Sequence, residues 1–354
     1  MASGLYGICH SNRSDESHWS KNCFNSSFPA SLACYMMDND IPALYVQLVK
    51  KNGRLCVETK KIPMRKVFNC GTAPASQLTF DFESVYPPYK RYSFDEIDRI
   101  DLVVKQAEKY LSALEVKLTV LPTSQTSTRP ESEWGCEMVI RSATTSYCAL
   151  GMFDAARSKA GEIREIFETE CSSIRAWDND FEMRHKTPVL SRCVDEFEQR
   201  FLSKQKPLVM QTIWKTQGMS PLLAENAFDV VVWSDYAFSR LFVDDSRVIE
   251  DEMSRPMRAT ARLARCLWEL SKSEKIHVPE IYRQMAFGNQ TDKEFAIAGK
   301  KWKNYVDSER ILRPILPKAV LRNIITDGYI EKLSPERRFD QTLYFTMRSQ
   351  LGGN

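Results

Sequence analysis

Three residues, Asp101, Glu115 and Lys117, have the types and the spacing needed for metal-assisted cleavage of a phosphodiester. Two carboxylates on paired strands can hold Mg²⁺, and an ammonium group beside them can act on the attacking water. The sequence therefore predicts Asp101 and Glu115 as metal ligands and all three residues as catalytic.

The stretches that carry these residues are typical of a β-hairpin. Residues 100–104 (IDLVV) and 114–121 (LEVKLTVL) are apolar and prone to form strands, and a polar connection separates them. Because side chains alternate along a strand, Glu115 and Lys117 share one face while Val116 takes the other. A buried polar pair in so apolar a strand is costly unless an ion, hydrogen bonds or a partner satisfies it, which favours a functional site.

A second hairpin repeats the same spacing. Residues 41–49 and 54–62 are strand-like, and an Asn-Gly turn joins them. Asp40 precedes the first strand, and Glu58 and Lys60 lie on the second, so spacing alone admits this set as well. The 54–62 strand is polar enough for an exposed edge, where an acid and a lysine need no functional explanation.

The overall composition is that of a globular protein with a sizeable core: 354 residues, 43% hydrophobic and 27% charged. The ten cysteines form no CxxC pair and the four histidines lack ligand spacing to them, so we expect neither a zinc site nor a catalytic histidine. No apolar run is long enough for a membrane span, and the first residues lack signal-peptide features. We expect a cytoplasmic protein with no membrane partner.

The net charge of +3 is unevenly distributed. Residues 255–354 carry 19 Lys plus Arg against 11 Asp plus Glu, a net +8, which leaves −5 for residues 1–254. A basic segment on a mildly acidic body fits a polyanionic partner. Arginine recurs every three or four residues along one predicted helix and so forms a stripe on one helix face: Arg255, Arg258, Arg262 and Arg265. Such a stripe could bind phosphate groups, but a solvent-exposed face is the commoner explanation.

The remaining pattern predicts a sheet flanked by helices. Residues 19–37 favour a helix, which is better formed after its proline. Residues 207–216 and 227–235 are typical of two further core strands. The hairpins and these strands together predict an α/β fold.

Beyond residue 250 the sequence pattern is helical, and residues 289–306 and 316–330 belong to it. We therefore place a boundary near residue 250. It separates a core over residues 1–250, with the N-terminal helix and the catalytic hairpin, from a helical basic region over residues 251–354.

Four segments of the chain are similar to the sequence motifs of one protein family: GLYGICHSNR (4–13), KNCFNSSFPASLACYM (21–36), LEVKLTVLP (114–122) and GCEMVIR (135–141). They resemble the HindVP-type restriction endonucleases, which are type II enzymes of the PD-(D/E)xK nuclease superfamily. The matching segments run over nearly the whole chain. The third segment is the most specific, and it selects Lys117 over Lys60.

The resemblance implies a PD-(D/E)xK restriction-endonuclease-like core, with a mixed central sheet flanked by helices and a helical basic C-terminal part. It makes Asp101 the metal-binding aspartate, Glu115 the second carboxylate, and Lys117 the lysine that positions or helps to deprotonate the water. Ile100 stands where the superfamily name has proline, and Asp98 is a second candidate for the aspartate. Many such enzymes use a further acidic residue on an early helix, which we do not assign.

The resemblance also implies the substrate, the cofactor and the partners. We expect Mg²⁺-dependent double-strand cuts in DNA at a short palindromic site of the GRCGYC kind, leaving 5′-phosphate ends. A homodimer would match the two-fold symmetry of the site, residues 251–354 would help to bind the DNA, and a cognate DNA methyltransferase would be the genetic partner. Two alternatives stay open: a nuclease of the same fold with little sequence preference, and a non-enzymatic DNA-binding regulator.

Four other charged residues have simpler explanations. We assign Glu83 and Glu96 as loop or helix charges rather than neighbours of a metal. Lys215 and Asp235 lie at the ends of predicted strands, near tryptophans. A structural ion pair explains each of them at least as well as contact with DNA.

Overall fold

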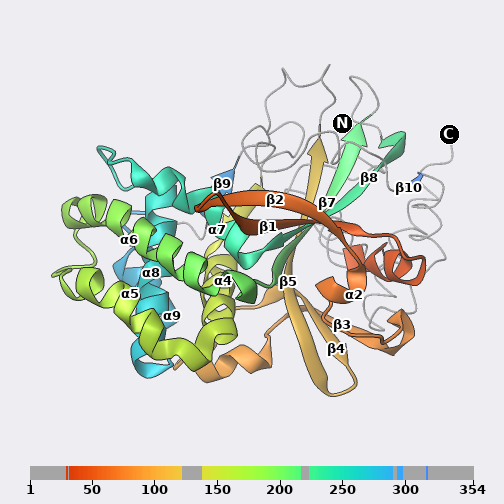
Figure 1. The fold of residues 1–354 in the computed structure, drawn as a ribbon, viewed down its shortest axis with the longest axis horizontal. Helices are drawn as coiled ribbons and strands as arrows, with labels where there is room; N and C mark the ends of the chain where they lie inside the picture. The colour runs from red at the N-terminus through yellow and green to blue at the C-terminus, as the bar shows by residue number, and fades with distance from the viewer. Residues whose placement is uncertain are drawn as a thin grey trace, which may run out of the picture.

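A mixed β-sheet forms the centre of the molecule. The computed structural model describes residues 29–30, 32–121, 138–216, 223–289, 293–297 and 316–317 (Figure 1). The sheet has the strand order β2-β1-β8-β7-β5-β4-β3; β1 runs parallel to β8 and β5 to β7, and the other neighbours are antiparallel. The predicted α/β fold with a mixed sheet is confirmed. The strand bounds are β1 (Ala43–Lys51), β2 (Arg54–Ile62), β3 (Leu78–Ser84), β4 (Ile100–Gln106), β5 (Lys109–Leu121), β7 (Pro207–Thr216) and β8 (Leu223–Ser234).

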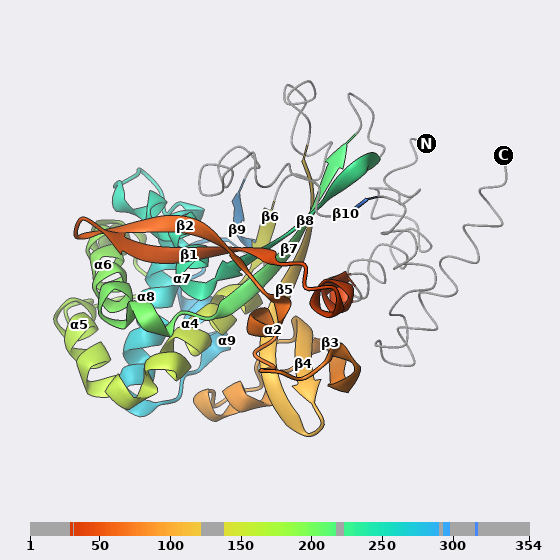
Figure 2. The same cartoon turned by 45° about the vertical axis from the view of Figure 1, so that its right-hand side comes forward.

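Helices cover both faces of this sheet (Figures 1 and 2). The larger hydrophobic core lies between the sheet and α4–α9, and a smaller one lies on the other face under the helical residues 32–38 and α2. Within the described ranges, no helix combines the length and the apolar character needed to cross a membrane. The helix bounds are α2 (Met64–Val67), α4 (Ser142–Ala156), α5 (Ala160–Ser172), α6 (Asp180–Phe201), α7 (Asp235–Val243), α8 (Arg255–Ser273) and α9 (Val278–Gln284).

Both predicted hairpins are present. The β1–β2 turn places Asn52 and Gly53 at φ values of 49° and 79°, the left-handed backbone that an Asn-Gly turn provides. In the β4–β5 hairpin Ala107 takes φ 50°, and β5 starts at Lys109, five residues before the predicted strand. The second hairpin is therefore longer and more tightly closed than its sequence pattern indicates.

The other predicted strands, β7 and β8, lie side by side in the centre of the sheet. The helix predicted over residues 19–37 is present at residues 29–30 and 32–37, and its remaining residues lie outside the described part of the chain. The 22-residue helix α6 was not predicted. Asn179 caps its N-terminus by accepting a hydrogen bond of 2.9 Å from the backbone N–H of Glu182.

Part of the C-terminal region is extended where the sequence pattern predicted helices. Helices α8 and α9 are present as predicted, but β9 (Lys293–Ile297) pairs antiparallel with β6 (Met138–Arg141), and β10 (Leu316–Pro317) pairs with β8. Phe295 at the centre of β9 is buried. Pairing with a distant strand therefore overrides the local helical tendency, and the rest of the two predicted helices lies outside the described residues.

The arginine stripe of α8 is not the solvated face that its spacing favoured. α8 packs against α4, α5, α6 and α7, so it shares a core with residues before position 250. Arg258, Arg262 and Arg265 are at most 8% exposed. Arg262 pairs with Glu294 of β9 and donates a hydrogen bond of 2.6 Å to the carbonyl oxygen of Met285. Because α8 is buried, these three arginines lie inside the protein, and Arg262 connects α8 to β9.

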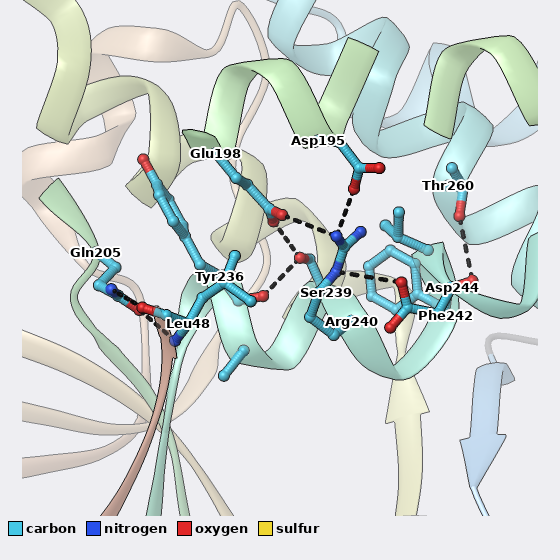
Figure 3. Close-up of polar contacts among 12 residues, drawn as sticks. Leu48, Asp195, Glu198, Gln205, Tyr236, Ser239, Arg240, Phe242, Asp244 and Thr260 are labelled. Carbon is cyan, nitrogen blue, oxygen red and sulfur yellow. Dashed lines mark hydrogen bonds and ion pairs between the residues drawn. The ribbon is translucent and has the colours of Figure 1, made fainter. Parts of the chain in front are cut away.

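A buried polar network joins α6 to α7 next to β1 (Figure 3). Arg240 pairs with Asp195 and lies 3.4 Å from the carboxylate of Glu198. Burial raises the pKa of Glu198 to about 7, although the charge of Arg240 acts in the opposite direction. Gln205 accepts a hydrogen bond from the backbone N–H of Leu48 and donates one to its carbonyl oxygen. The network fixes two helices against the parallel strands of the sheet.

We predict that Glu294→Ala lowers the free energy of unfolding by about 3–5 kcal/mol, because it leaves the buried guanidinium of Arg262 without its carboxylate. The double variant Arg262→Met with Glu294→Leu should recover most of this loss, since no buried charge remains. Urea unfolding followed by circular dichroism measures both variants. A single variant as stable as the wild type would contradict the assigned role of the pair.

Candidate active site

Asp101 and Glu115 lie opposite each other on the β4–β5 hairpin. Their neighbours Leu102 and Leu114 form a ladder pair, which sets the register of the two acids. The carboxylate of Asp101 also accepts a hydrogen bond of 2.8 Å from the backbone N–H of Val116. The hairpin geometry on which the predicted site depends is therefore present.

Glu115 and Lys117 lie on the same face of β5, as the alternation predicts. The Nζ atom of Lys117 lies 2.5 Å from Oε1 of Glu115, and the two side chains are only 18% and 7% exposed. This ion pair satisfies one carboxylate of the hairpin. Two acids thus share one ammonium group.

Electrostatics mark Asp101 as the less compensated of the two acids. Burial, and after it the charge of Glu115, raise the pKa of Asp101 to about 7, while Lys117 and the Val116 N–H act in the opposite direction. Glu83, predicted to be a loop or helix charge, lies instead on the neighbouring strand β3, and its charge adds a smaller contribution that raises the pKa of Asp101. A cation at this pair would relieve the repulsion.

The donors present suit Mg²⁺. Carboxylate oxygens are its preferred protein ligands, and one or two carboxylates suffice because water and substrate phosphate complete the octahedron. In the described ranges there is no group of three or more His, Cys, Asp or Glu able to hold a metal, so the acid pair is the set to consider. Asp101 and Glu115 therefore fit a site for a single hard cation.

The strand beside β5 braces the site. In the parallel β5–β7 pair Lys117 lies opposite Gln211, which is fully buried and accepts a hydrogen bond of 2.9 Å from the indole of Trp233. Thr212 donates a hydrogen bond of 3.3 Å to the carbonyl oxygen of Lys117. These contacts hold the backbone that carries the lysine.

The rival hairpin is arranged differently. Glu58 lies on the edge strand β2 and pairs with the exposed Lys51. Asp40 is exposed in the turn before β1, and Lys60 is exposed with its ammonium 5.7 Å from the ring centre of Tyr45. This set contains no buried pair of carboxylates, so its spacing has the ordinary explanation of a solvated edge.

The first residue of β4 and the residues just before it explain the departures from the superfamily pattern. Ile100 is 2% exposed and belongs to the larger core, opposite Ser84 of β3. Asp98 is exposed, and its carbonyl oxygen accepts a hydrogen bond of 3.0 Å from the hydroxyl of Tyr147. Asp101, unlike Asp98, has a hydrogen bond to the strand that carries Glu115.

The sequence reasoning missed a group of tyrosines next to the site. A cavity of about 270 Å³ is lined by the residues of β5 and β7 that come just before their first ladder pair, Glu115 with Val209. Tyr86, Tyr89 and Tyr147 line it. The rings pack edge-on or tilted with centroids 4.9–5.8 Å apart. No periodic pattern marks this cluster, because its members come from a loop, a short 3₁₀ turn and α4.

Asp235 lies in the wall of the same cavity at the start of α7. One carboxylate oxygen accepts hydrogen bonds from the backbone N–H groups of Lys206 and Tyr236 at 3.0 and 2.9 Å. Burial raises the pKa of Asp235 to about 7, and these two hydrogen bonds lower it less than burial raises it. Backbone amides, rather than the ion pair or DNA contact considered from the sequence, are its partners; the side chain of Lys215 lies outside the described residues.

The mixed sheet with flanking helices and an acidic hairpin defines a restriction-endonuclease-like α/β core. The chain belongs to the HindVP restriction endonuclease family, whose family model matches residues 19–349. The resemblance inferred from the sequence motifs is thereby confirmed.

Two relatives are similar over nearly their whole length. The type II restriction enzyme HgiDI of Herpetosiphon aurantiacus is 32% identical over 348 residues, which cover 97% of this chain and 96% of that protein. The probable type II restriction enzyme HindVP of Haemophilus influenzae is 29% identical over 344 residues, which cover 96% and 92%. No solved structure matches the chain. The expectation of a type II restriction enzyme is confirmed at the level of the family.

We predict that Asp235 makes stability depend on pH. Its pKa of about 7 in the folded protein exceeds the unfolded value of about 4, so its stabilising contribution is complete below pH 4 and is lost as the pH rises through 7. Asp235→Asn removes this loss, so the free energy of unfolding of the variant minus that of the wild type should increase between pH 5 and 8. Urea titrations at several pH values test this, and a constant difference would contradict it.

Proposed function

We propose that this chain is a type II restriction endonuclease that cuts both strands of duplex DNA at a short palindromic site in a Mg²⁺-dependent reaction. The observation that supports this best is the neighbouring pair of the buried Glu115 and the partly buried Asp101 with Lys117 beside it, in a chain of a restriction endonuclease family. A recognition sequence of the GRCGYC kind and 5′-phosphate ends complete the proposal.

Each residue of the hairpin has a part in this chemistry. Asp101 and Glu115 would hold Mg²⁺, which when bound supplies electrophilic stabilisation of the phosphate and a water of lowered pKa. Lys117 donates hydrogen bonds from the same face, to the attacking water or to a phosphate oxygen. The Val116 N–H keeps the Asp101 carboxylate turned toward β5. Water attacks phosphorus, the bond from phosphorus to O3′ breaks, and a 5′-phosphate and a 3′-hydroxyl remain.

The assembly follows from the symmetry of the substrate. A palindromic site has a two-fold axis, so a homodimer can present one hairpin to each strand. Residues 251–354, with their excess of basic side chains, would add to DNA binding, and the boundary near residue 250 belongs to this proposal. A cognate DNA methyltransferase would protect the host, and the enzyme would work in the cytoplasm.

Glu115→Ala and Lys117→Ala should each lower the rate of plasmid cleavage by about a thousandfold or more, since the loss of metal binding or of the positioned water costs several kcal/mol at the transition state. Folding and metal-independent DNA binding should stay close to wild type, because neither variant changes the basic surface elsewhere. Single-turnover cleavage, circular dichroism and gel-shift assays measure the three properties.

The rival hairpin supplies the matched control for these variants. Glu58→Ala removes an acid at the same spacing on an exposed edge, so its cleavage rate should stay within about twofold of the wild type. Full activity in Glu115→Ala would refute the assigned site. Loss of activity in a folded Glu58→Ala would instead assign it to the β1–β2 hairpin.

Sequence specificity has its own test. Digestion of a large DNA of known sequence should give discrete fragments with Mg²⁺ and no strand scission with a chelator present. Mapping of the fragment ends identifies the site and the cut position. A smear would indicate a nuclease with little sequence preference, and binding without any scission would indicate a regulator.

A further inference from the structure

Tyr147 of α4 joins the two ends of the segment that connects β3 to β4. Its hydroxyl accepts a hydrogen bond of 3.0 Å from the backbone N–H of Tyr86, two residues after β3 ends. The same hydroxyl donates a hydrogen bond of 3.0 Å to the carbonyl oxygen of Asp98, two residues before β4 begins. The buried Tyr147 side chain, 2% exposed, thus connects the two ends of the segment that leads into β4 and Asp101.

Core packing holds the Tyr147 ring, and the two hydrogen bonds connect its hydroxyl to the segment. Tyr147 lines the cavity of about 270 Å³ on one side and a second cavity of about 160 Å³ on the other. The second cavity is also lined by Glu96, Ile97 and Asp98, the residues just before β4. The ring itself packs against the ring of Tyr89, with centroids 5.8 Å apart, and the hydroxyl adds the directional restraint on the ends of the segment.

The middle of the connecting segment is held independently. Phe94 donates a backbone hydrogen bond to Ile276, and Ile276 donates one to Tyr92. The hydroxyl of Tyr92 donates to Asp154. Removal of the Tyr147 hydroxyl therefore frees the ends of the segment next to the strands while its middle stays in place.

The phenol also lies within the electrostatic reach of the hairpin. Burial raises the pKa of Tyr147 to about 12, and the charges of Asp98 and Glu115 add to the increase. The hydroxyl therefore keeps its proton at any working pH and donates to Asp98 throughout.

We infer that Tyr147 is a positioning residue that sets where Asp101 stands relative to Glu115, and thereby sets the affinity of this acid pair for a divalent cation. This inference rests on the proposed function, because it takes the acid pair as the metal site. Tyr147 acts through the backbone of Asp98, three residues before Asp101, and does not itself touch the metal or the DNA.

The test compares Tyr147→Phe with Tyr89→Phe in the full-length protein. Both variants remove one hydroxyl from the same aromatic cluster, but the hydroxyl of Tyr89 takes no part in the bridge between Tyr86 and Asp98. Mn²⁺ binding followed by electron paramagnetic resonance measures the site without turnover. The Mg²⁺ concentration for half-maximal plasmid cleavage measures it during catalysis, and thermal unfolding checks both folds.

We expect Tyr147→Phe to weaken Mn²⁺ binding and to raise the half-maximal Mg²⁺ concentration by about tenfold, the effect typical of residues that support metal ligands. Excess Mg²⁺ should restore most of the cleavage rate, and Tyr89→Phe should match the wild type in both assays. Unchanged metal dependence in Tyr147→Phe, or an equal change in both variants, would overturn the inference while leaving the proposed function intact. A wild type that neither binds Mn²⁺ nor needs a divalent metal for cleavage would instead overturn the proposed function.

Discussion

The mutual repulsion of two neighbouring carboxylates on one hairpin, Glu115 buried and Asp101 partly buried, is the constraint that the rest of the structure has to sustain. Asp101 and Glu115 share a single ammonium, and both burial and the charge of Glu115 oppose ionisation of Asp101. Two strands that were free to separate would relieve this repulsion by moving apart. Protonation of Asp101, whose pKa is about 7, relieves part of the repulsion, and a fixed backbone on both sides keeps the two acids close together.

Apolar anchors on the opposite face provide most of that fixation. Leu102 and Leu114, the ladder pair next to the acids, are completely buried in the smaller core, and Val116 joins them there. Along β5, Glu115 and Lys117 therefore alternate with Leu114 and Val116, which pack in the smaller core. A slip of one residue would turn these anchors toward the site and the acids into the core, so the hydrophobic pattern also fixes the register of the candidate catalytic residues. β7 completes the restraint by pairing with β5 from Glu115 onward.

Local sequence patterns predicted the features that depend on neighbouring residues in the chain, such as strand faces and turns. The alternation in LEVKLTVL placed Glu115 and Lys117 on one face, and the Asn-Gly turn placed β1 and β2. The burial of Arg262, by contrast, depends on helices and a strand that are distant in the chain, so its spacing resembled a solvated face. Tyr147 carried no signal at all, because its partners are backbone groups of a connection 49 and 61 residues away. Contacts between residues so distant in the chain produce no periodic pattern in the sequence.

Solvent exposure, together with uncompensated negative charge, separates the candidate site from the structural carboxylates of the same protein, since Glu198, Asp235 and Glu294 are at most 2% exposed. Glu198 has Arg240 at 3.4 Å and a hydroxyl donor, and Glu294 has Arg262, so each of these carboxylates has a guanidinium beside it. Asp235 has backbone amides at the start of a helix, where negative charge is tolerated. Asp101 is instead partly exposed, and it lies beside Glu115, whose ion-pair partner is Lys117. A deficit of positive charge at a partly exposed position is what a binding site for a cation requires, since an arrangement already neutral would gain little from an ion. This contrast supports the proposal that Asp101 and Glu115 are metal ligands.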